Sequence, residues 1–229
     1  MTESLLEIEG QKFFVRDGTN DSDVVRSCRT EYVLPTMDGY EPGSFCVDIG
    51  AHLGAWTIWA AQEYQGSRLI AIEPIPENQT LFLKNVALNN LDDRVILIRA
   101  AAWSTKEPTI VIPYGDESSE SGRIHKFIGN VTGLPQSHSQ HVVARTVGFA
   151  EILSGAPKVW CVKWDAENAE TPVIDEASIE DLQRCAWHIG EFHTNLQAIR
   201  EKMSSAGFVE HAMPAGHFCF QNELPFRVL

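Results

Sequence analysis

The sequence predicts an α/β fold built on a doubly wound, mostly parallel sheet, with residues 1–229 forming a single domain. Between residues 44 and 101, short apolar strands alternate with amphipathic helices, and strands that are apolar on both faces are typical of parallel sheets covered by helices. Near the C-terminus, two apolar segments flank Ala215 and Gly216 and predict an antiparallel hairpin. The chain of 229 residues is long enough for one domain of this kind.

The first half of the chain predicts three strands and two helices. The predicted strands are residues 44–50 (SFCVDIG), 68–74 (RLIAIEP) and 94–101 (RVILIRAA). The predicted helices are residues 55–64 (AWTIWAAQEY) and 76–90 (PENQTLFLKNVALNN). The second helix opens with proline and glutamate, which both favour the first turn of a helix.

The flanking segments are less regular. We expect residues 1–43 to form a helical lead-in. We expect residues 103–146 to form an excursion with one short strand (TIVIP) and a mobile loop at residues 114–140, where substrate specificity often resides. The sheet then resumes with strands at 159–165 and 187–193, helices at 179–185 and 195–207, and the hairpin at 208–214 and 217–223.

Composition limits the classes of partner. The net charge is −13 and the pI is near 5.0, with no run of basic residues, so we expect no nucleic acid partner. No apolar run approaches the ~18–20 residues of a membrane span, and the first residues do not resemble a signal peptide, so we expect a cytoplasmic protein. The five cysteines are scattered without metal-ligand spacing and are expected to be reduced core residues.

The segment VDIGAHLGAW, residues 47–56, predicts a ligand site. Gly50 and Gly54 follow a buried strand, and glycines there let the chain turn sharply and approach a ligand closely. The next predicted strand ends at Glu73, where doubly wound nucleotide-binding folds place a carboxylate against ribose hydroxyls. These features predict a pocket for a nucleoside.

The identity of the nucleoside depends on the glycine spacing. Dinucleotide-binding folds use G-x-G-x-x-G, whereas this sequence has G-x-x-x-G directly after the segment that contains Asp48. A carboxylate there would repel a pyrophosphate and would suit an ammonium group, contacted directly or through water. The spacing therefore favours S-adenosylmethionine over a nicotinamide dinucleotide.

Several segments together resemble the FkbM-family methyltransferases. They are RDGTNDSDVV, VDIGAHLGAWTIWAA, AIEPIPENQTLFLKNVALNNL, ILIRAAAWS, VKWDAENAE and HIGEFH, and they span roughly Phe14 to Phe220. The resemblance implies the class I, Rossmann-like fold of S-adenosylmethionine-dependent enzymes, with a seven-stranded sheet whose last strand is reversed. It also implies methyl transfer to oxygen, usually a hydroxyl of a sugar, a glycan or a small natural product.

The resemblance also implies roles for individual residues in cofactor binding. The loop after the first strand would hold the methionine part, Glu73 the ribose, and residues after the second and third strands the adenosine. His52 stands where the family more often has Asn, and it can still donate a hydrogen bond. The implied cofactor residues are Asp48, Gly50, Ala51, His52, Gly54, Glu73, Pro74, Ala101 and Ala102.

Candidate catalytic residues follow the last two parallel strands. Methyl transfer requires an aligned nucleophile and a base for the hydroxyl proton. We expect Asp165 or His193 to act as that base, with Glu191 and Lys163 positioning the substrate. Two departures from the family are Asn168 in place of the usual Gly, and TPVID in place of the usual L-K-G run.

Alternative interpretations remain open at this stage. Asp165, Glu191 and His193, together with Glu167, would suit a divalent metal such as Mg²⁺ or Mn²⁺. Alternatively, the glycines are plain turn residues, Asp165 is a strand-end cap and His193 is structural. Rival functions are a nicotinamide-dependent oxidoreductase, a cofactor-binding module without turnover, and a methyltransferase that acts on protein or RNA.

Overall fold

The structure is a computed structural model, which describes residues 2–114, 140–193 and 195–223. The expected loop at 114–140 lies almost entirely outside the described residues. Within the described ranges, no helix combines the length and the apolar character needed to cross a membrane.

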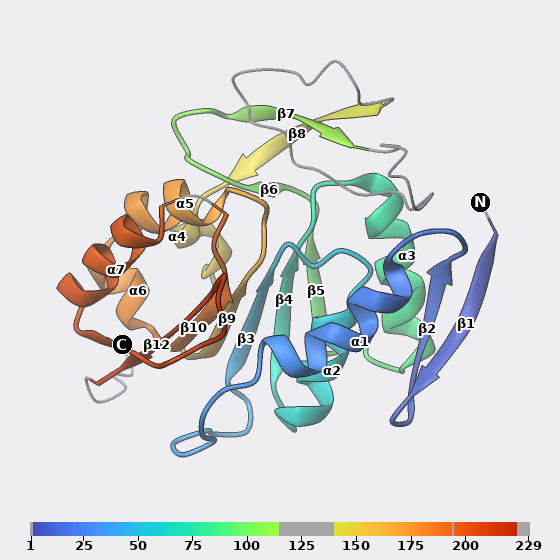
Figure 1. The fold of residues 1–229 in the computed structure, drawn as a ribbon, viewed down its shortest axis with the longest axis horizontal. Coiled ribbons are helices and arrows are strands. Elements are labelled where there is room, and N and C mark those ends of the chain that lie inside the picture. Colours follow the sequence, from blue (N-terminus) through green and yellow to red (C-terminus); the bar gives the residue numbers. More distant parts are fainter. Residues whose placement is uncertain (1, 115–139, 194, 224–229) are drawn as a thin grey trace.

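A seven-stranded sheet forms the centre of the molecule (Figure 1). Its order is β11 (Phe208–Glu210), β12 (His217–Asn222), β10 (Cys185–Glu191), β9 (Val159–Trp164), β3 (Phe45–Ile49), β4 (Arg68–Ile72) and β5 (Val95–Ile98). The five strands from β10 to β5 are parallel, whereas β12 runs antiparallel to both β10 and β11. This order confirms the predicted doubly wound sheet with an antiparallel hairpin at its end.

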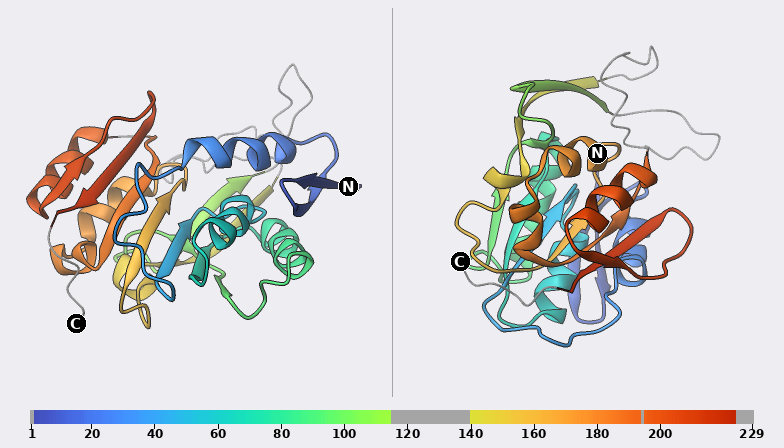
Figure 2. Two further views of the ribbon diagram at one scale, coloured as in Figure 1. Left: turned by 90° about the horizontal axis from the view of Figure 1, so that it is seen from below. Right: turned by 90° about the vertical axis from the view of Figure 1, so that its left-hand side faces the viewer.

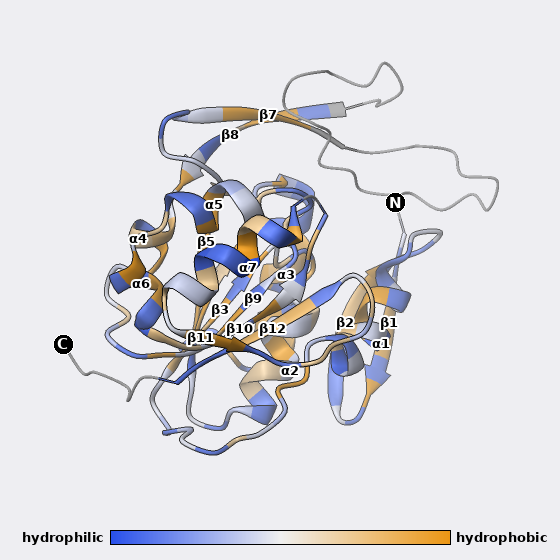
Figure 3. Cartoon of the chain, turned by 60° about the vertical axis from the view of Figure 1, so that its left-hand side comes forward, coloured by the Kyte–Doolittle hydropathy of each residue, from blue (hydrophilic) through white to orange (hydrophobic). Residues whose placement is uncertain are grey.

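Helices cover both faces of this sheet (Figure 2). Helices α1 (Asp21–Glu31), α2 (Ala55–Glu63) and α3 (Pro76–Leu88) contribute to one apolar cluster, and α4 (Phe149–Ile152), α5 (Glu170–Glu176), α6 (Ile179–Gln183) and α7 (Leu196–Ser205) to another. Neighbouring residues of β3 divide between the clusters, with Cys46 in the first and Val47 in the second, as the period of two requires. Figure 3 shows hydrophobic residues concentrated on the strands between the helical layers.

The expected helical lead-in is wrong for its first part. Residues 3–16 form an antiparallel hairpin of β1 (Glu3–Ile8) and β2 (Gln11–Arg16), and only α1 is helical. Helix α3 holds β2 through side-chain amides. Asn85 accepts from the backbone N–H of Phe14 at 2.7 Å, and Asn89 from that of Lys12 at 3.1 Å. The hairpin thereby extends the fold beside α3 and directs the chain into α1.

A small sheet lies above the carboxyl edge of the central sheet (Figures 1 and 2). It consists of β6 (Ala101–Ala102), β8 (Gln140–Val147) and β7 (Thr109–Tyr114). The short strand predicted at TIVIP is β7, whereas β8 was not expected. Ala101 and Ala102 do not end the third strand of the main sheet, because they pair with β8 instead. Ile110 and Ile112 form the small apolar core of this sheet.

The remaining expectations about local structure agree with the fold. Helix α3 has a proline in its first turn, as predicted. All five cysteines are unpaired thiols and buried, as predicted for core residues. Trp56 and Trp59 lie in the apolar cluster on the α2 face of the sheet.

Candidate active site

A cavity of about 360 Å³ opens at the carboxyl edge of the parallel strands. Its wall is built from the segments that follow β3, β4, β9 and β10, from β6 and β7, and from one face of α1. Doubly wound folds bind their ligands at this edge. The small side chains of Ala51, Ala101 and Ala102 line the wall and leave room for a ligand.

The loop between β3 and α2 requires glycine at two positions. Gly50 has a φ of +80°, and a Cβ there would lie 1.8 Å from the carbonyl oxygen of Asp165. Gly54 has a φ of +90° and caps the N-terminus of α2. His52, between them, is also left-handed at +52°, and His, like Asn, is enriched in this conformation. The predicted turn is present, and it packs closely against the end of β9.

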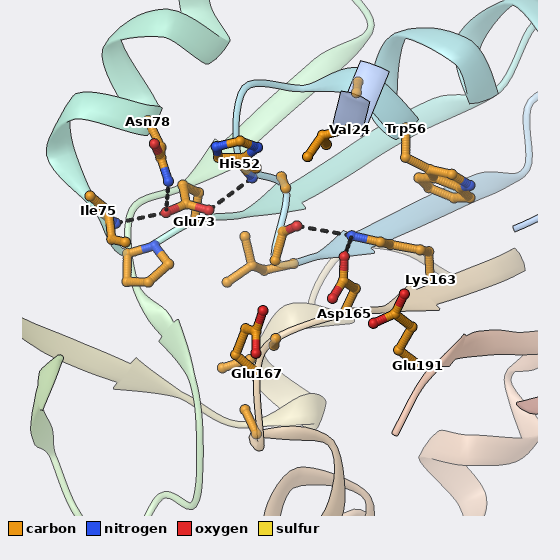
Figure 4. Close-up of a pocket in the computed structure, with 18 of the residues that line it drawn as sticks. Val24, His52, Trp56, Glu73, Ile75, Asn78, Lys163, Asp165, Glu167 and Glu191 are labelled. Carbon is orange, nitrogen blue, oxygen red and sulfur yellow. Dashed lines mark hydrogen bonds and ion pairs between the residues drawn. The ribbon is translucent and has the colours of Figure 1, made fainter. Parts of the chain in front are cut away.

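Glu73 lies at the cavity wall with its carboxylate fixed by three donors (Figure 4). It accepts hydrogen bonds from the backbone N–H groups of His52 at 2.8 Å and Ile75 at 2.9 Å, and from the side-chain amide of Asn78 at 3.1 Å. Pro74 lines the cavity beside it. The structure therefore brings the predicted ribose carboxylate and the glycine loop together in one wall.

Asp48 occupies a different place from the one expected, because it is fully buried and does not line the cavity. One oxygen accepts a hydrogen bond from the Thr57 hydroxyl at 2.6 Å, and the other lies 3.1 Å from the Lys163 ammonium. Asp48 and Lys163 face each other across β3 and β9. Strand alternation turns the Asp48 side chain toward α2. Its expected contact with a ligand ammonium, directly or through water, stays a prediction.

Lys163 holds the glycine loop, residues 50–54 between β3 and α2, in place. Its ammonium donates to the carbonyl oxygen of Gly50 at 2.9 Å and lies 3.5 Å from the Asp165 carboxylate. Burial opposes its charge, but Asp48 and Asp165 outweigh that effect and raise the pKa of Lys163 above its usual value. Lys163 is therefore an internal cation that holds the loop, and because it also lines the cavity, its role in positioning the substrate stays a prediction.

Acidic side chains gather at the end of the cavity opposite Glu73 (Figure 4). Asp165 and Glu167 follow β9, Glu191 ends β10, and Glu31 ends α1. Burial raises the pKa of Asp165, with Lys163 opposing and Glu191 adding to the shift. Burial also raises the pKa of Glu167, to about 7.

His193 does not line the cavity, although it lies close to three carboxylates. Its ring lies 3.3 Å from Glu170, 3.3 Å from Glu191 and 3.6 Å from Glu167. Hydrogen bonding to Glu170 and Glu191 raises the pKa of His193 to about 11. A protonated histidine cannot accept the proton of a substrate, so this raised pKa favours Asp165 over His193 as the base, and both assignments stay predictions.

The chain passes through two left-handed residues after β9. Glu167 has a φ of +53° and Asn168 a φ of +88°. Asn tolerates this conformation better than most residues, which explains why it can replace the family's glycine. The fully buried Glu170 fixes the turn by accepting from the backbone N–H groups of Ala166 at 2.7 Å and Asn168 at 3.1 Å. The departure at Asn168 therefore preserves the local backbone.

Helix α1 contributes wall residues that the sequence patterns did not reveal. Glu31 and the buried Tyr32 lie at its C-terminal end, and the carboxylates of Asp165 and Glu191 face the Tyr32 hydroxyl. Burial and these charges raise the pKa of Tyr32 far above its usual value. The only available signal was helical spacing, because Val24, Cys28 and Tyr32 are four residues apart.

Polar contacts join the N-terminus of α1 to His52 in the glycine loop. Asp21, which is fully buried, accepts two bonds of 2.7 Å from the Arg16 guanidinium and lies 3.4 Å from the His52 ring. Arg16 also donates to the Asn78 side chain at 3.0 Å. The position of α1 is therefore linked to the residues that hold Glu73.

The metal hypothesis gains no support from this arrangement. Ligand atoms of Asp165, Glu167 and His193 lie within 4.8 Å of one another, as do those of Glu31, Glu191 and His217. Carboxylates this close together are common in proteins without a bound ion, and proximity is the one feature that points to a metal in either of these groups of described residues. We therefore assign no metal ligands.

Comparison with known proteins gives one family match. The model of the methyltransferase FkbM domain matches residues 48–210, well over half of the chain. No curated protein matches significantly.

Several solved structures resemble the chain at low identity. Precorrin-6y C5,15-methyltransferase from Geobacter metallireducens is 13% identical, with a TM-score of 0.43, over 86% of this chain and 77% of that one. TrmK from M. capricolum, solved with S-adenosylhomocysteine, is 10% identical, with a TM-score of 0.44, over 81% and 65%. TYW2 from P. horikoshii, solved with MeSAdo, is 13% identical, with a TM-score of 0.48, over 96% and 69%.

Proposed function

The chain belongs to the FkbM family of methyltransferases, and we propose that it transfers the methyl group of S-adenosylmethionine to a hydroxyl oxygen of a sugar, a glycan or another small natural product. The observation that carries this proposal is the pair of carboxylates, Asp165 and Glu167, across the cavity from Glu73. With the family established, the nicotinamide-dependent alternative has no remaining support.

S-adenosylmethionine, the methyl donor, fits the residues on the Glu73 side of the cavity. Glu73 faces the cavity with a fixed carboxylate that suits ribose hydroxyls, and the glycine loop leaves space where a Cβ would obstruct the backbone. Ala101, Ala102 and Trp103 supply small and aromatic surface for the adenine. When bound, S-adenosylmethionine supplies a methyl group activated by a positively charged sulfur.

Residues of the chain would orient the acceptor hydroxyl and accept its proton. Asp165 lines the cavity, and its raised pKa makes it a better proton acceptor than an ordinary aspartate. Glu191 and the Tyr32 hydroxyl lie beside it and can orient the acceptor hydroxyl by hydrogen bonding. We assign Asp165 the role of base, which leaves His193 and Lys163 as internal cations that hold the carboxylates in place.

Charge supports a small acceptor over a nucleic acid. The protein carries a net charge of −13, and four carboxylates line the acceptor end of the cavity. A phosphate backbone entering this end would meet repulsion instead of the basic surface that it needs. Neutral polyhydroxyl compounds, by contrast, can donate hydrogen bonds to carboxylates.

Methyl transfer from isotopically labelled S-adenosylmethionine tests this proposal. The acceptor panel contains neutral glycosides, polysaccharide fragments and hydroxylated macrolactones, with bulk tRNA and a protein extract as comparison. We expect label in a hydroxyl compound, and a loss of roughly 10²–10⁴-fold in rate for Asp165→Asn. Asp175→Asn, which alters an exposed side chain of α5, serves as the matched control. Label in tRNA or protein alone, or donor binding without transfer to any acceptor, would contradict the hydroxyl assignment.

A further inference from the structure

The acceptor end of the cavity carries an excess of negative charge. Glu31, Asp165, Glu167 and Glu191 line it, and Lys163 is the one lysine or arginine among the lining residues that the structure describes. This balance is unusual for a partly enclosed site, because like charges in a region of reduced dielectric repel one another strongly.

The nearby cations have buried partners of their own. Lys163 lies 3.1 Å from Asp48, and His193 lies 3.3 Å from Glu170, and both of these carboxylates are fully buried. Each cation is therefore shared with a cavity carboxylate, since Lys163 also lies 3.5 Å from Asp165 and His193 also lies 3.3 Å from Glu191. Two cations then face five carboxylates, and the balance around this end of the cavity stays negative. The raised pKa of Glu167, about 7, agrees with this excess, since its causes are burial and the charges of Asp165, Glu170 and Glu191, with His193 opposing.

The order of the strands indicates which part of a bound S-adenosylmethionine lies next to Asp165 and Glu167. Glu73 follows β4, the glycine loop follows β3, and Asp165 and Glu167 follow β9, the next strand in the sheet. A donor whose ribose lies at Glu73 and whose amino-acid part follows the glycine loop carries its sulfonium between these two parts. The sulfonium therefore faces the end of β9.

We infer that Asp165 and Glu167 form a charge-selective wall that binds the methyl donor, with its positively charged sulfur, more tightly than the product S-adenosylhomocysteine, whose sulfur is neutral. This inference rests on the proposed function and assigns these two side chains a role in donor recognition. On methyl transfer, the methyl carbon forms a bond to the acceptor oxygen, whose proton passes to Asp165. The electron pair of the sulfur–carbon bond returns to sulfur, and the sulfonium becomes a neutral thioether. The wall then loses its attraction for the cofactor, which favours exchange of product for a new donor.

Calorimetric titration of the wild-type protein with three ligands tests the inference without an acceptor. The ligands are S-adenosylmethionine, S-adenosylhomocysteine and sinefungin, which carries an ammonium in place of the sulfonium. We expect the two charged ligands to bind more tightly than S-adenosylhomocysteine. Glu167→Gln and Asp165→Asn should each reduce this preference by about tenfold and leave the affinity for S-adenosylhomocysteine nearly unchanged.

Glu180→Gln is the matched control, because it removes the same formal charge from an exposed position on α6, which precedes β10 and so lies at the opposite edge of the sheet. Two separate wall variants are used so that misfolding of one does not decide the result. An unchanged ratio of affinities in both folded variants would overturn the inference while leaving the proposed function intact. Failure of the wild-type protein to bind any of the three ligands would overturn the proposed function and, with it, this inference.

Discussion

The ammonium of Lys163 lies 3.1 Å from the carboxylate of Asp48 across neighbouring parallel strands, and both side chains are buried. Lys163 also donates to the Gly50 carbonyl, so this ion pair holds the glycine loop in place. Asp48 therefore acts on the cofactor loop indirectly, through Lys163 and through its bond to Thr57.

Removal of one partner of this pair should destabilise the fold strongly. Lys163→Met leaves Asp48 charged and buried without its cation, and such changes cost about 3–5 kcal/mol in the free energy of unfolding. Urea denaturation measures this loss, with Lys106→Met at an exposed position as the control. A loss below about 1 kcal/mol would show that the pair contributes little to stability.

The charge of His193 predicts a dependence of stability on alkaline pH. Its pKa is raised from 6.5 to about 11 in the folded protein, so its stabilising contribution is complete below about pH 6.5 and is lost as the pH rises through 11. The difference in unfolding free energy between wild type and His193→Gln should therefore shrink steadily from pH 6 to pH 10.5 or so. Urea titrations across this range measure it.

The control for that series is His211→Gln, because this ring bonds to Gln221 on β12 and lies outside the carboxylate cluster. A difference for His193→Gln that stays constant with pH would argue against the protonated state assigned to His193.

The polar contacts between α1 and the glycine loop predict that one substitution changes both the stability of the fold and the affinity for the donor. Asp21→Asn removes the charge that holds the Arg16 guanidinium, which should cost about 3–5 kcal/mol of stability and weaken donor binding, because α1 forms one wall of the cavity. Asp23→Asn, an exposed change in the same turn, should have a small effect on both. Thermal unfolding and calorimetry measure the two effects, and donor affinity unchanged by Asp21→Asn would disconnect α1 from the site.

The central sheet was predictable from sequence because its signals are local. Apolar strands, a proline-initiated helix and the spacing from Gly50 to Glu73 each depend on residues close together in the chain. The β1–β2 hairpin was missed although it is local, with a turn at Glu9 and Gly10, which both have a positive φ. Its place beside α3 depends on amides about seventy residues away. Strand β8 was missed because its partners β6 and β7 are separated from it in the sequence by residues 115–139.

The roles of individual site residues depended on contacts that sequence spacing does not reveal. The register between β3 and β9 places Asp48 opposite Lys163, and spacing within one strand does not reveal that partner. The charge of His193 is set by Glu170, which lies on a different element. Tyr32 belongs to a helix far from the motifs in sequence, so only the folded chain brings it beside Asp165.

The most direct test of the account is calorimetric titration of S-adenosylmethionine and, separately, NAD⁺ into wild type, Gly50→Ala and Gly155→Ala. Both glycines have a φ near +80°, at +80° and +81°, but only Gly50 would place a Cβ against backbone, whereas Gly155 faces open space. We expect saturable binding of S-adenosylmethionine to wild type and Gly155→Ala, affinity reduced by roughly a hundredfold or more in Gly50→Ala, and no binding of NAD⁺. Equal affinity of the two alanine variants for S-adenosylmethionine, or a preference of wild type for NAD⁺, would contradict it.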